Sequence, residues 1–274
     1  MLLDYKIYQH DSSQEWVVFL HGVGGNHTIF YKQAKQFKKN FNCLFINFPG
    51  HGKSKPLDAK YTTRNIADKV LEVLDHLSLR KAHFIGISLG SMVMTEIGHK
   101  MPDRVASMTM GGAVVKWKFW TDMLFKIAYK VRSFVPYMLL YKFFARILMP
   151  KKNHKDSRTT FVNEASKLGQ REFVRWTELL TVSKSLYKRF LSMPKQIPKL
   201  YLMGDEDHVF LKGAQFAADR DPNASLQIID DSGHVCNIDQ ANQFNDYTIS
   251  FIEKHTDDGA KNTDEKYNEN ITIA

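Results

Sequence analysis

Short apolar runs alternate along the chain with longer segments in which apolar residues recur every three or four positions. The runs are bounded by turn residues, as expected of buried strands, and they cover residues 16–20, 43–48, 83–87, 105–110, 200–203 and 226–229. The segments with helical spacing lie between them, at residues 30–40, 62–77, 89–100, 212–219 and 238–254. This repeated alternation predicts an α/β fold with a mostly parallel, doubly wound sheet.

One segment, residues 115–193, interrupts the alternation and has only helical patterns. Pro136 divides its first helical piece, and Pro194 and Pro198 follow its end, as expected of a residue that cannot continue a helix. We therefore expect residues 1–114 and 194–255 to form the core, with residues 115–193 inserted as a helical cap. Residues 256–274 are polar and have almost no large apolar side chains, which predicts a disordered tail.

The composition is that of a globular protein with one large core. The 274 residues are 43% apolar, which excludes a low-complexity or collagen-like chain. The two cysteines, Cys43 and Cys236, indicate no disulfide framework. No apolar signal segment is visible near the N-terminus, so the expected location is cytoplasmic. The uncharged apolar stretch at residues 133–141 is far shorter than the roughly 20 residues that a membrane span requires.

Candidate chemistry begins with Gly-Ile-Ser-Leu-Gly at residues 86–90, which fits the pattern G-x-S-x-G. An apolar strand precedes it and a helical pattern follows it. In such an elbow the serine lies in a strained turn that presents its Oγ above the sheet, and the glycines avoid clashes there. The pattern predicts Ser88 as a nucleophile.

A serine hydroxyl needs a base beside it, and the base needs a carboxylate to fix its tautomer. The strand at 200–203 runs into Asp205, Glu206 and Asp207, and the strand at 226–229 is followed by His234. In open α/β sheets, ligands bind at this carboxyl edge of the strands. We therefore expect His234 as the base, and one of the three carboxylates as its partner.

The segment His-Gly-Val-Gly-Gly at residues 21–25 follows the strand at 16–20. A glycine-rich turn at this place can direct backbone N–H groups toward an oxyanion above the serine, and we expect the donors to be the amides of Val23 and Leu89. A dinucleotide site is disfavoured, because the third glycine of that fingerprint is absent. His21 and, in a later turn, His51 and Ser54 are expected to shape their loops, and Cys236 to be a packing residue.

Together these motifs resemble the α/β-hydrolase superfamily, specifically the serine hydrolases with a helical cap. The resemblance extends over residues 15–255. It rests on His21-Gly22, the Phe-Pro-Gly-His-Gly-Lys-Ser turn at 48–54, the elbow at 86–90, Met-Pro-Asp-Arg-Val at 101–105, Gly204-x-x-Asp207 and Gly233-His234. It implies that Ser88 is the nucleophile, Asp207 the acid and His234 the base, with no metal or organic cofactor. The chain departs from many members at Asn47, where they carry an aspartate.

The predicted function is hydrolysis of carboxylic esters of apolar acyl groups, as in a carboxylesterase or a monoacylglycerol lipase. Thioesterases, carbon–carbon bond hydrolases and the lyase of menaquinone synthesis have the same fold, and chemistry depends on the pocket rather than the fold. A different class of function is an inactive module that binds a membrane or a partner, in which Ser88 is vestigial.

The net charge of +9 comes entirely from the predicted cap. Residues 115–193 hold 17 basic and 5 acidic residues, whereas the remainder holds 21 basic and 24 acidic ones. The cations are either a solvated helix face or a contact for anionic head groups of a membrane. In the second interpretation, neighbouring apolar residues line an acyl pocket or touch lipid, namely Trp120, Leu124, Ile127, Val131 and Phe134. Nucleic acid is not an expected partner, because no recognition motif accompanies the charge.

Overall fold

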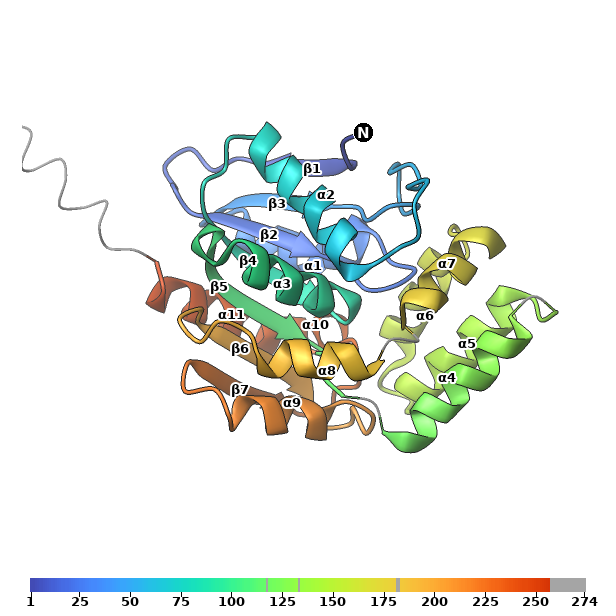
Figure 1. The fold of residues 1–274 in the computed structure, drawn as a ribbon. Helices are drawn as coiled ribbons and strands as arrows, with labels where there is room; N and C mark the ends of the chain where they lie inside the picture. Colours follow the sequence, from blue (N-terminus) through green and yellow to red (C-terminus); the bar gives the residue numbers. More distant parts are fainter. Residues whose placement is uncertain (117, 133, 181–182, 257–274) are drawn as a thin grey trace, which may run out of the picture.

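A seven-stranded sheet forms the centre of the molecule (Figure 1). The structure, a computed structural model, describes residues 1–116, 118–132, 134–180 and 183–256. The strands are ordered β1-β3-β2-β4-β5-β6-β7, and all neighbouring pairs are parallel except β1 with β3. Their bounds are β1 Tyr5–Tyr8, β2 Trp16–Leu20, β3 Asn42–Ile46, β4 Ala82–Ile87, β5 Val105–Gly111, β6 Lys199–Gly204 and β7 Ala224–Ile229.

Five of the six predicted apolar runs form the inner strands β2 to β6, and the sixth, at 226–229, forms the edge strand β7. The inner strands have continuous apolar runs because they are covered on both faces. Every residue of β3, β4 and β6 is buried, as expected of a parallel sheet between two helical layers. The predicted mostly parallel α/β sheet is therefore confirmed. Strand β1 has no counterpart among the predicted strands. It lies at the edge of the sheet, half-buried, with Tyr5 opposite Ile46 of β3, so its sequence lacks a continuous apolar run.

Helices cover both faces of the sheet (Figure 1). One layer contains α2 (Thr63–His76), α3 (Leu89–Lys100), α8 (Ser183–Leu191) and α9 (Leu211–Ala218), and the other contains α1 (Tyr31–Phe37) and α11 (Ala241–Lys254). Short helical turns adjoin three of them: η1 (His27–Phe30) precedes α1, η2 (Pro102–Arg104) follows α3, and α10 (Cys236–Asp239) precedes α11. The predicted helix at 62–77 is α2, whose first turn is capped by the side chains of Thr62 and Asn65.

Helices α4 to α8 connect β5 to β6. Their first four members are α4 (Phe119–Val131), α5 (Tyr137–Leu148), α6 (Lys155–Ala165) and α7 (Gln170–Leu180). These four lie beyond the carboxyl ends of the strands (Figure 1), whereas α8 packs against α3 in the sheet-covering layer. Pro136 is the N-terminal capping residue of α5, as its position in the sequence predicts. The insertion thus places four helices above the strand edge where ligands bind.

Within the described part of the chain, no helix combines the length and apolar character that crossing a membrane requires. The predicted tail at 256–274 lies, except for Thr256, outside the described residues. Cys43 and Cys236 are both buried and are not joined in a disulfide.

Candidate active site

Ser88 lies in a sharp turn between β4 and α3. Its backbone has a φ of 52° and a ψ of −109°, a left-handed conformation that is strained for a residue with a Cβ atom. Gly90 allows this turn, because a Cβ atom there would lie 2.1 Å from the backbone oxygen of Leu20 in β2. In this elbow the backbone of α3 at Gly90 therefore lies directly against the backbone of β2, with no room for a side chain between them. The elbow leaves Ser88 partly exposed, while its neighbours Ile87 and Leu89 are buried.

Two side chains from distant loops form a hydrogen-bonded chain with Ser88. Oγ of Ser88 is 3.0 Å from Nε2 of His234, and Nδ1 of His234 is 2.8 Å from Oδ2 of Asp207. A carboxylate only accepts hydrogen bonds, so the imidazole proton is on Nδ1 and Nε2 can accept the serine proton. His234 and Asp207 are both almost fully buried. The structure thus brings together the three residues that the motifs single out.

The position of Asp207 is fixed by its own loop. Its Oδ1 accepts hydrogen bonds from the backbone N–H groups of Val209 and Phe210, at 3.2 and 3.0 Å. The other two candidate carboxylates point elsewhere. Asp205 accepts a hydrogen bond from the Ser232 N–H, and Glu206 contacts Lys151 and His154 of the insertion. Asp207 is therefore the carboxylate in contact with His234.

The glycine-rich turn after β2 lies next to Ser88. The Gly25 N–H donates to the Gly22 carbonyl oxygen at 3.1 Å, and Gly24 between them has a φ of 75°, which is typical of a tight turn with glycine at the third position. None of the described residues accepts a hydrogen bond from the N–H of Val23 or from the N–H of Leu89, which lies at the start of α3. First-turn amides of a helix have no partner within the helix. Both are free to bind an acceptor above Ser88.

Two buried histidines hold this turn. His21 Nδ1 donates to the Gly22 carbonyl oxygen at 2.7 Å, and its Nε2 accepts from the Phe48 N–H at 3.0 Å. His51 Nε2 accepts from the Gly24 N–H at 3.0 Å, and its Nδ1 donates to the Pro49 carbonyl oxygen. Burial lowers the pKa of His51 from 6.5 to about 4, and burial and His51 lower the pKa of His21 well below 6.5. Both imidazoles are neutral at pH 7 and act as structural hydrogen-bonding groups.

Tyr141 of α5 also contacts this turn, and sequence reasoning missed it. Its hydroxyl donates to the carbonyl oxygen of Val23 at 2.6 Å. The Val23–Gly24 peptide is thus fixed at both ends, by Tyr141 at the carbonyl and by His51 at the N–H. The sequence shows Tyr141 only as one position in an apolar helix, and a helical pattern does not reveal what lies opposite a given residue.

A largely apolar cavity of about 70 Å³ lies between Ser88 and the insertion helices. Apart from Val23, Ser88 and His234, its walls are formed by Val114, Phe125, Tyr141, Phe144, Leu148, Phe161, Phe173, Thr177 and Phe210. Aromatic rings stack within this wall, with the centroids of Phe125 and Phe144 separated by 4.3 Å. A smaller cavity of about 20 Å³ also adjoins Ser88, next to Ile29 and Ile238. Among the residues that the structure describes, no Lys, Arg, Asp or Glu lines either cavity.

The prediction that Trp120, Leu124 and Ile127 line this cavity is wrong. None of the three belongs to its wall, and Trp120 and Ile127 are exposed. Among the described residues of α4, the one in the wall is Phe125, and successive helical residues point about 100° apart. Because α4 is apolar on two faces, its sequence does not show which face turns inward.

Other reactive side chains are not part of this arrangement. Burial raises the pKa of the Cys43 thiol to about 12, and it also raises the pKa of Cys236. Both thiols are thus protonated and inert near neutral pH, and Cys236 packs as predicted. Among the described residues, no group of three His, Cys, Asp or Glu side chains could hold a metal ion.

Comparison with known proteins matches residues 15–241 to the family model of the alpha/beta hydrolase fold. The dihydrolipoyllysine-residue acetyltransferase component of the acetoin cleaving system of Pseudomonas putida is 25% identical over 247 residues, 87% of this chain and 64% of that protein. The (E)-2-((N-methylformamido)methylene)succinate hydrolase of Acinetobacter baylyi is 30% identical over 109 residues, 40% of this chain and 41% of that enzyme. The chain thus spans less than two thirds of the length of either relative. Further relatives bear the names of an enol-lactonase, carbamate hydrolases and a methyl ester esterase.

Similarity to solved structures extends over nearly the whole chain. An esterase from Exiguobacterium antarcticum superposes with a TM-score of 0.79 at 18% identity, covering 91% of this chain and 95% of that one. At this identity the similarity concerns the fold. From the sheet topology, the elbow at Ser88 and the match over residues 15–241, we conclude that the chain belongs to the alpha/beta hydrolase fold family.

Proposed function

We propose that this protein is a serine hydrolase that cleaves carboxylic esters of apolar acyl groups through an acyl-enzyme. The observation that carries the proposal is the hydrogen-bonded chain from Ser88 through His234 to Asp207 at the mouth of an apolar cavity. Esterases and other hydrolases among its relatives support the reaction class.

In the first half of the reaction, Ser88 Oγ attacks the ester carbonyl carbon while His234 Nε2 takes the hydroxyl proton. The carbonyl oxygen becomes an oxyanion, which accepts hydrogen bonds from the N–H groups of Val23 and Leu89. The bond to the alcohol oxygen then breaks, and His234 returns its proton to that oxygen. In the second half, His234 takes a proton from water and the resulting hydroxide attacks the acyl carbon. The bond from that carbon to Ser88 Oγ then breaks as His234 returns the proton to Oγ, which releases the carboxylic acid and restores the free enzyme.

The residues that line the larger cavity favour a substrate with an apolar acyl group. No Lys or Arg among the described residues lines the cavity. A substrate that carries a carboxylate would find no cation among these wall residues, and an unpaired charge is costly to bury. The relative from Acinetobacter baylyi is named for a substituted succinate, which is a dicarboxylate. We infer that this chain takes a different substrate class within the same family.

A chain-length series of p-nitrophenyl esters tests this assignment. Each methylene group buried in the cavity is expected to raise kcat/KM by up to about fourfold until the cavity is full. A maximum at the acetate ester would contradict the apolar pocket. Acyl-coenzyme A thioesters of the same lengths form a parallel series, and faster cleavage of the thioesters would favour a thioesterase.

The roles of Ser88 and Asp207 are tested with a fluorophosphonate probe and two variants. Ser88→Ala is expected to abolish labelling, and Asp207→Asn to lower kcat by about 10⁴-fold, because the imidazole loses its tautomer-fixing partner. Asp205→Asn is the matched control, since Asp205 lies two residues away and the one described hydrogen bond of its side chain is that from the Ser232 N–H. Equal losses in the two Asp→Asn variants, or an unlabelled wild-type protein, would contradict the proposal.

A further inference from the structure

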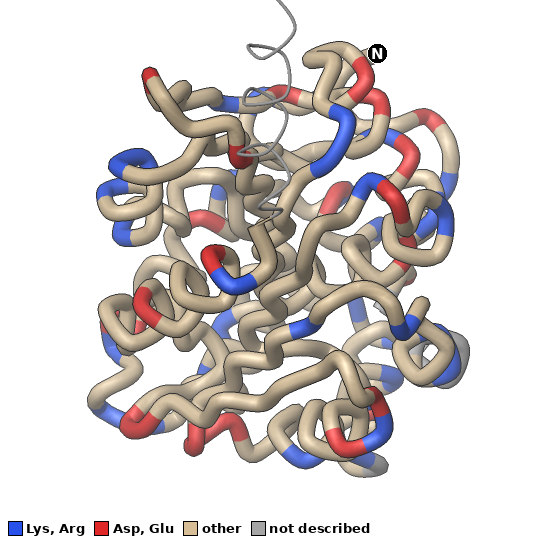
Figure 2. Tube along the Cα trace, turned by 90° about the vertical axis from the view of Figure 1, so that its left-hand side faces the viewer, with Lys and Arg blue, Asp and Glu red and all other residues tan. Residues whose placement is uncertain are grey.

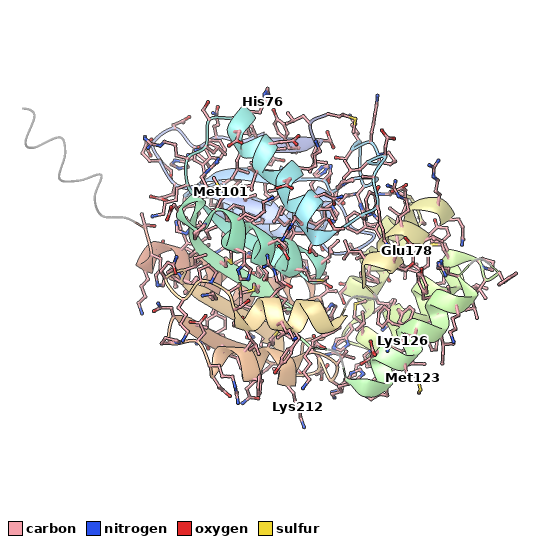
Figure 3. All side chains as sticks on the ribbon, in the orientation of Figure 1. His76, Met101, Met123, Lys126, Glu178 and Lys212 are labelled. Carbon is pink, nitrogen blue, oxygen red and sulfur yellow. The ribbon has the colours of Figure 1, made fainter. Side chains whose placement is uncertain are left out.

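Helices α4 and α5 expose an unusual number of large apolar side chains. They lie at the outer edge of the insertion (Figure 1), and Figure 3 labels Met123 and Lys126 on α4. Of the twelve exposed large hydrophobic residues among those described, six lie in or between these two helices: Trp120, Met123, Ile127, Phe134, Leu139 and Phe143. Phe134, between the helices, is 89% exposed. Isolated exposed apolar residues are normal, but a cluster indicates an interaction surface.

The exposed residues form a face distinct from the cavity wall. On α4 the exposed positions 120, 123, 127 and 130 follow helical spacing, which places them on one side. The cavity wall receives Phe125 from α4 and Tyr141, Phe144 and Leu148 from α5. Each helix thus packs one apolar face inside the molecule and leaves a second one to the solvent.

Cations accompany the apolar residues on this face. Lys126, Lys130, Lys142 and Arg146 are exposed, and Asp122 is the only acidic residue in the sequence of the two helices. The opposite end of the molecule is different, because basic and acidic residues are interspersed there (Figure 2). A second copy of the chain would bring two such basic faces together in a symmetric dimer, which disfavours self-association.

We propose that the exposed face of α4 and α5 docks on a membrane surface that contains anionic phospholipid. The apolar side chains enter the boundary between head groups and acyl chains, while the Lys and Arg side chains contact lipid phosphates. The amphipathic helices lie on the bilayer rather than across it. This surface goes beyond the proposed hydrolysis, and docking does not depend on Ser88.

Co-sedimentation with vesicles tests the proposal. The full chain is expected to bind vesicles of equal parts phosphatidylcholine and phosphatidylglycerol, to bind phosphatidylcholine alone much more weakly, and to lose binding as salt increases. Replacing Lys130, Lys142 and Arg146 with glutamine is expected to weaken binding about 100-fold, from about fivefold for each cation near the surface. Equal, salt-independent binding to both vesicle types, or no binding to either, would overturn the proposal.

Ile127→Glu tests the apolar part of the face, and Ile228→Glu is its matched control. Ile127 is 51% exposed and Ile228, on the edge strand β7, is 44% exposed. Only Ile127→Glu is expected to weaken vesicle binding, and both variants should cleave a water-soluble ester at the wild-type rate. Ser88→Ala should bind vesicles normally, which separates docking from hydrolysis. If the protein did not bind vesicles but formed a dimer in sedimentation equilibrium, and if Ile127→Glu dissociated this dimer, the face would instead be assigned to contact with a second copy of the chain.

Discussion

The direction of the Val23 N–H is set by hydrogen bonds to the neighbouring backbone groups of the turn, and not by a hydrogen bond of this N–H. The peptide that follows it is fixed by Tyr141 at the carbonyl and by His51 at the N–H, and the Gly22 carbonyl accepts from both His21 and Gly25. With these flanking groups occupied, the Val23 N–H remains as the donor toward Ser88. A donor that is oriented before the reaction stabilises a developing oxyanion without reorganisation.

Tyr141→Phe is expected to lower kcat by about three- to tenfold, which corresponds to one hydrogen bond of about 1 kcal/mol. The phenyl ring preserves the cavity wall, so KM should change little. Steady-state kinetics with a soluble ester separates the two constants.

The matched control is Tyr137→Phe, because the Tyr137 hydroxyl also donates from α5 to a backbone oxygen, that of Ser166 at 2.9 Å, away from Ser88. The same loss of kcat in both variants would show that Tyr141 only stabilises the helix. An unchanged kcat in Tyr141→Phe would contradict its positioning role.

At the scale of elements, the elbow depends on how closely α3 approaches β2. A Cβ atom on Gly90 would meet the rigid backbone of Leu20, one residue before the turn that begins at His21. Gly90→Ala is therefore expected to separate helix from sheet and to lower the free energy of unfolding by about 3 kcal/mol or more. Urea denaturation measures this change.

Gly98→Ala is the comparison within the same helix. A Cβ atom there would lie 2.8 Å from the terminal methyl of Met108, which can move, and alanine favours the helix by about 1 kcal/mol over glycine. This variant should keep its stability within about 1 kcal/mol of wild type. If Gly90→Ala were equally stable, the close contact would not be needed for the elbow.

Elements that depend on local sequence could be predicted, whereas their mutual packing could not. The inner strands have continuous apolar runs because both their faces are buried. Ser88 directly follows one of them, β4, whereas His234 lies in the loop after the edge strand β7. Strand β1 was missed because an edge strand buries less of its surface. The wall of the cavity was predicted from Trp120 and Ile127 instead of Phe125, because two apolar faces of α4 compete and only tertiary contacts choose between them.

At the scale of the whole molecule, folding buries His21 and His51 as neutral groups, which makes stability depend on pH. The pKa of His51 falls from 6.5 to about 4 on burial, so between these values the unfolded chain binds a proton that the folded protein excludes. Since the unfolded state then binds more protons, the free energy of unfolding decreases as pH falls from 6.5 toward 4. Burial acts in the same direction on His21.

We expect His51→Gln to flatten this dependence, because glutamine can accept the Gly24 N–H hydrogen bond but does not titrate. The slope of the unfolding free energy against pH should decrease by up to about 1.4 kcal/mol per pH unit between pH 6.5 and 4. Urea denaturation at a series of pH values measures it. His76→Gln is the control, since His76 is exposed at the end of α2 (Figure 3) and belongs to neither cavity beside Ser88. If His51→Gln retained the wild-type slope, the acid sensitivity would have to come from other groups, and the neutral form of His51 would not be what holds the turn beside Ser88.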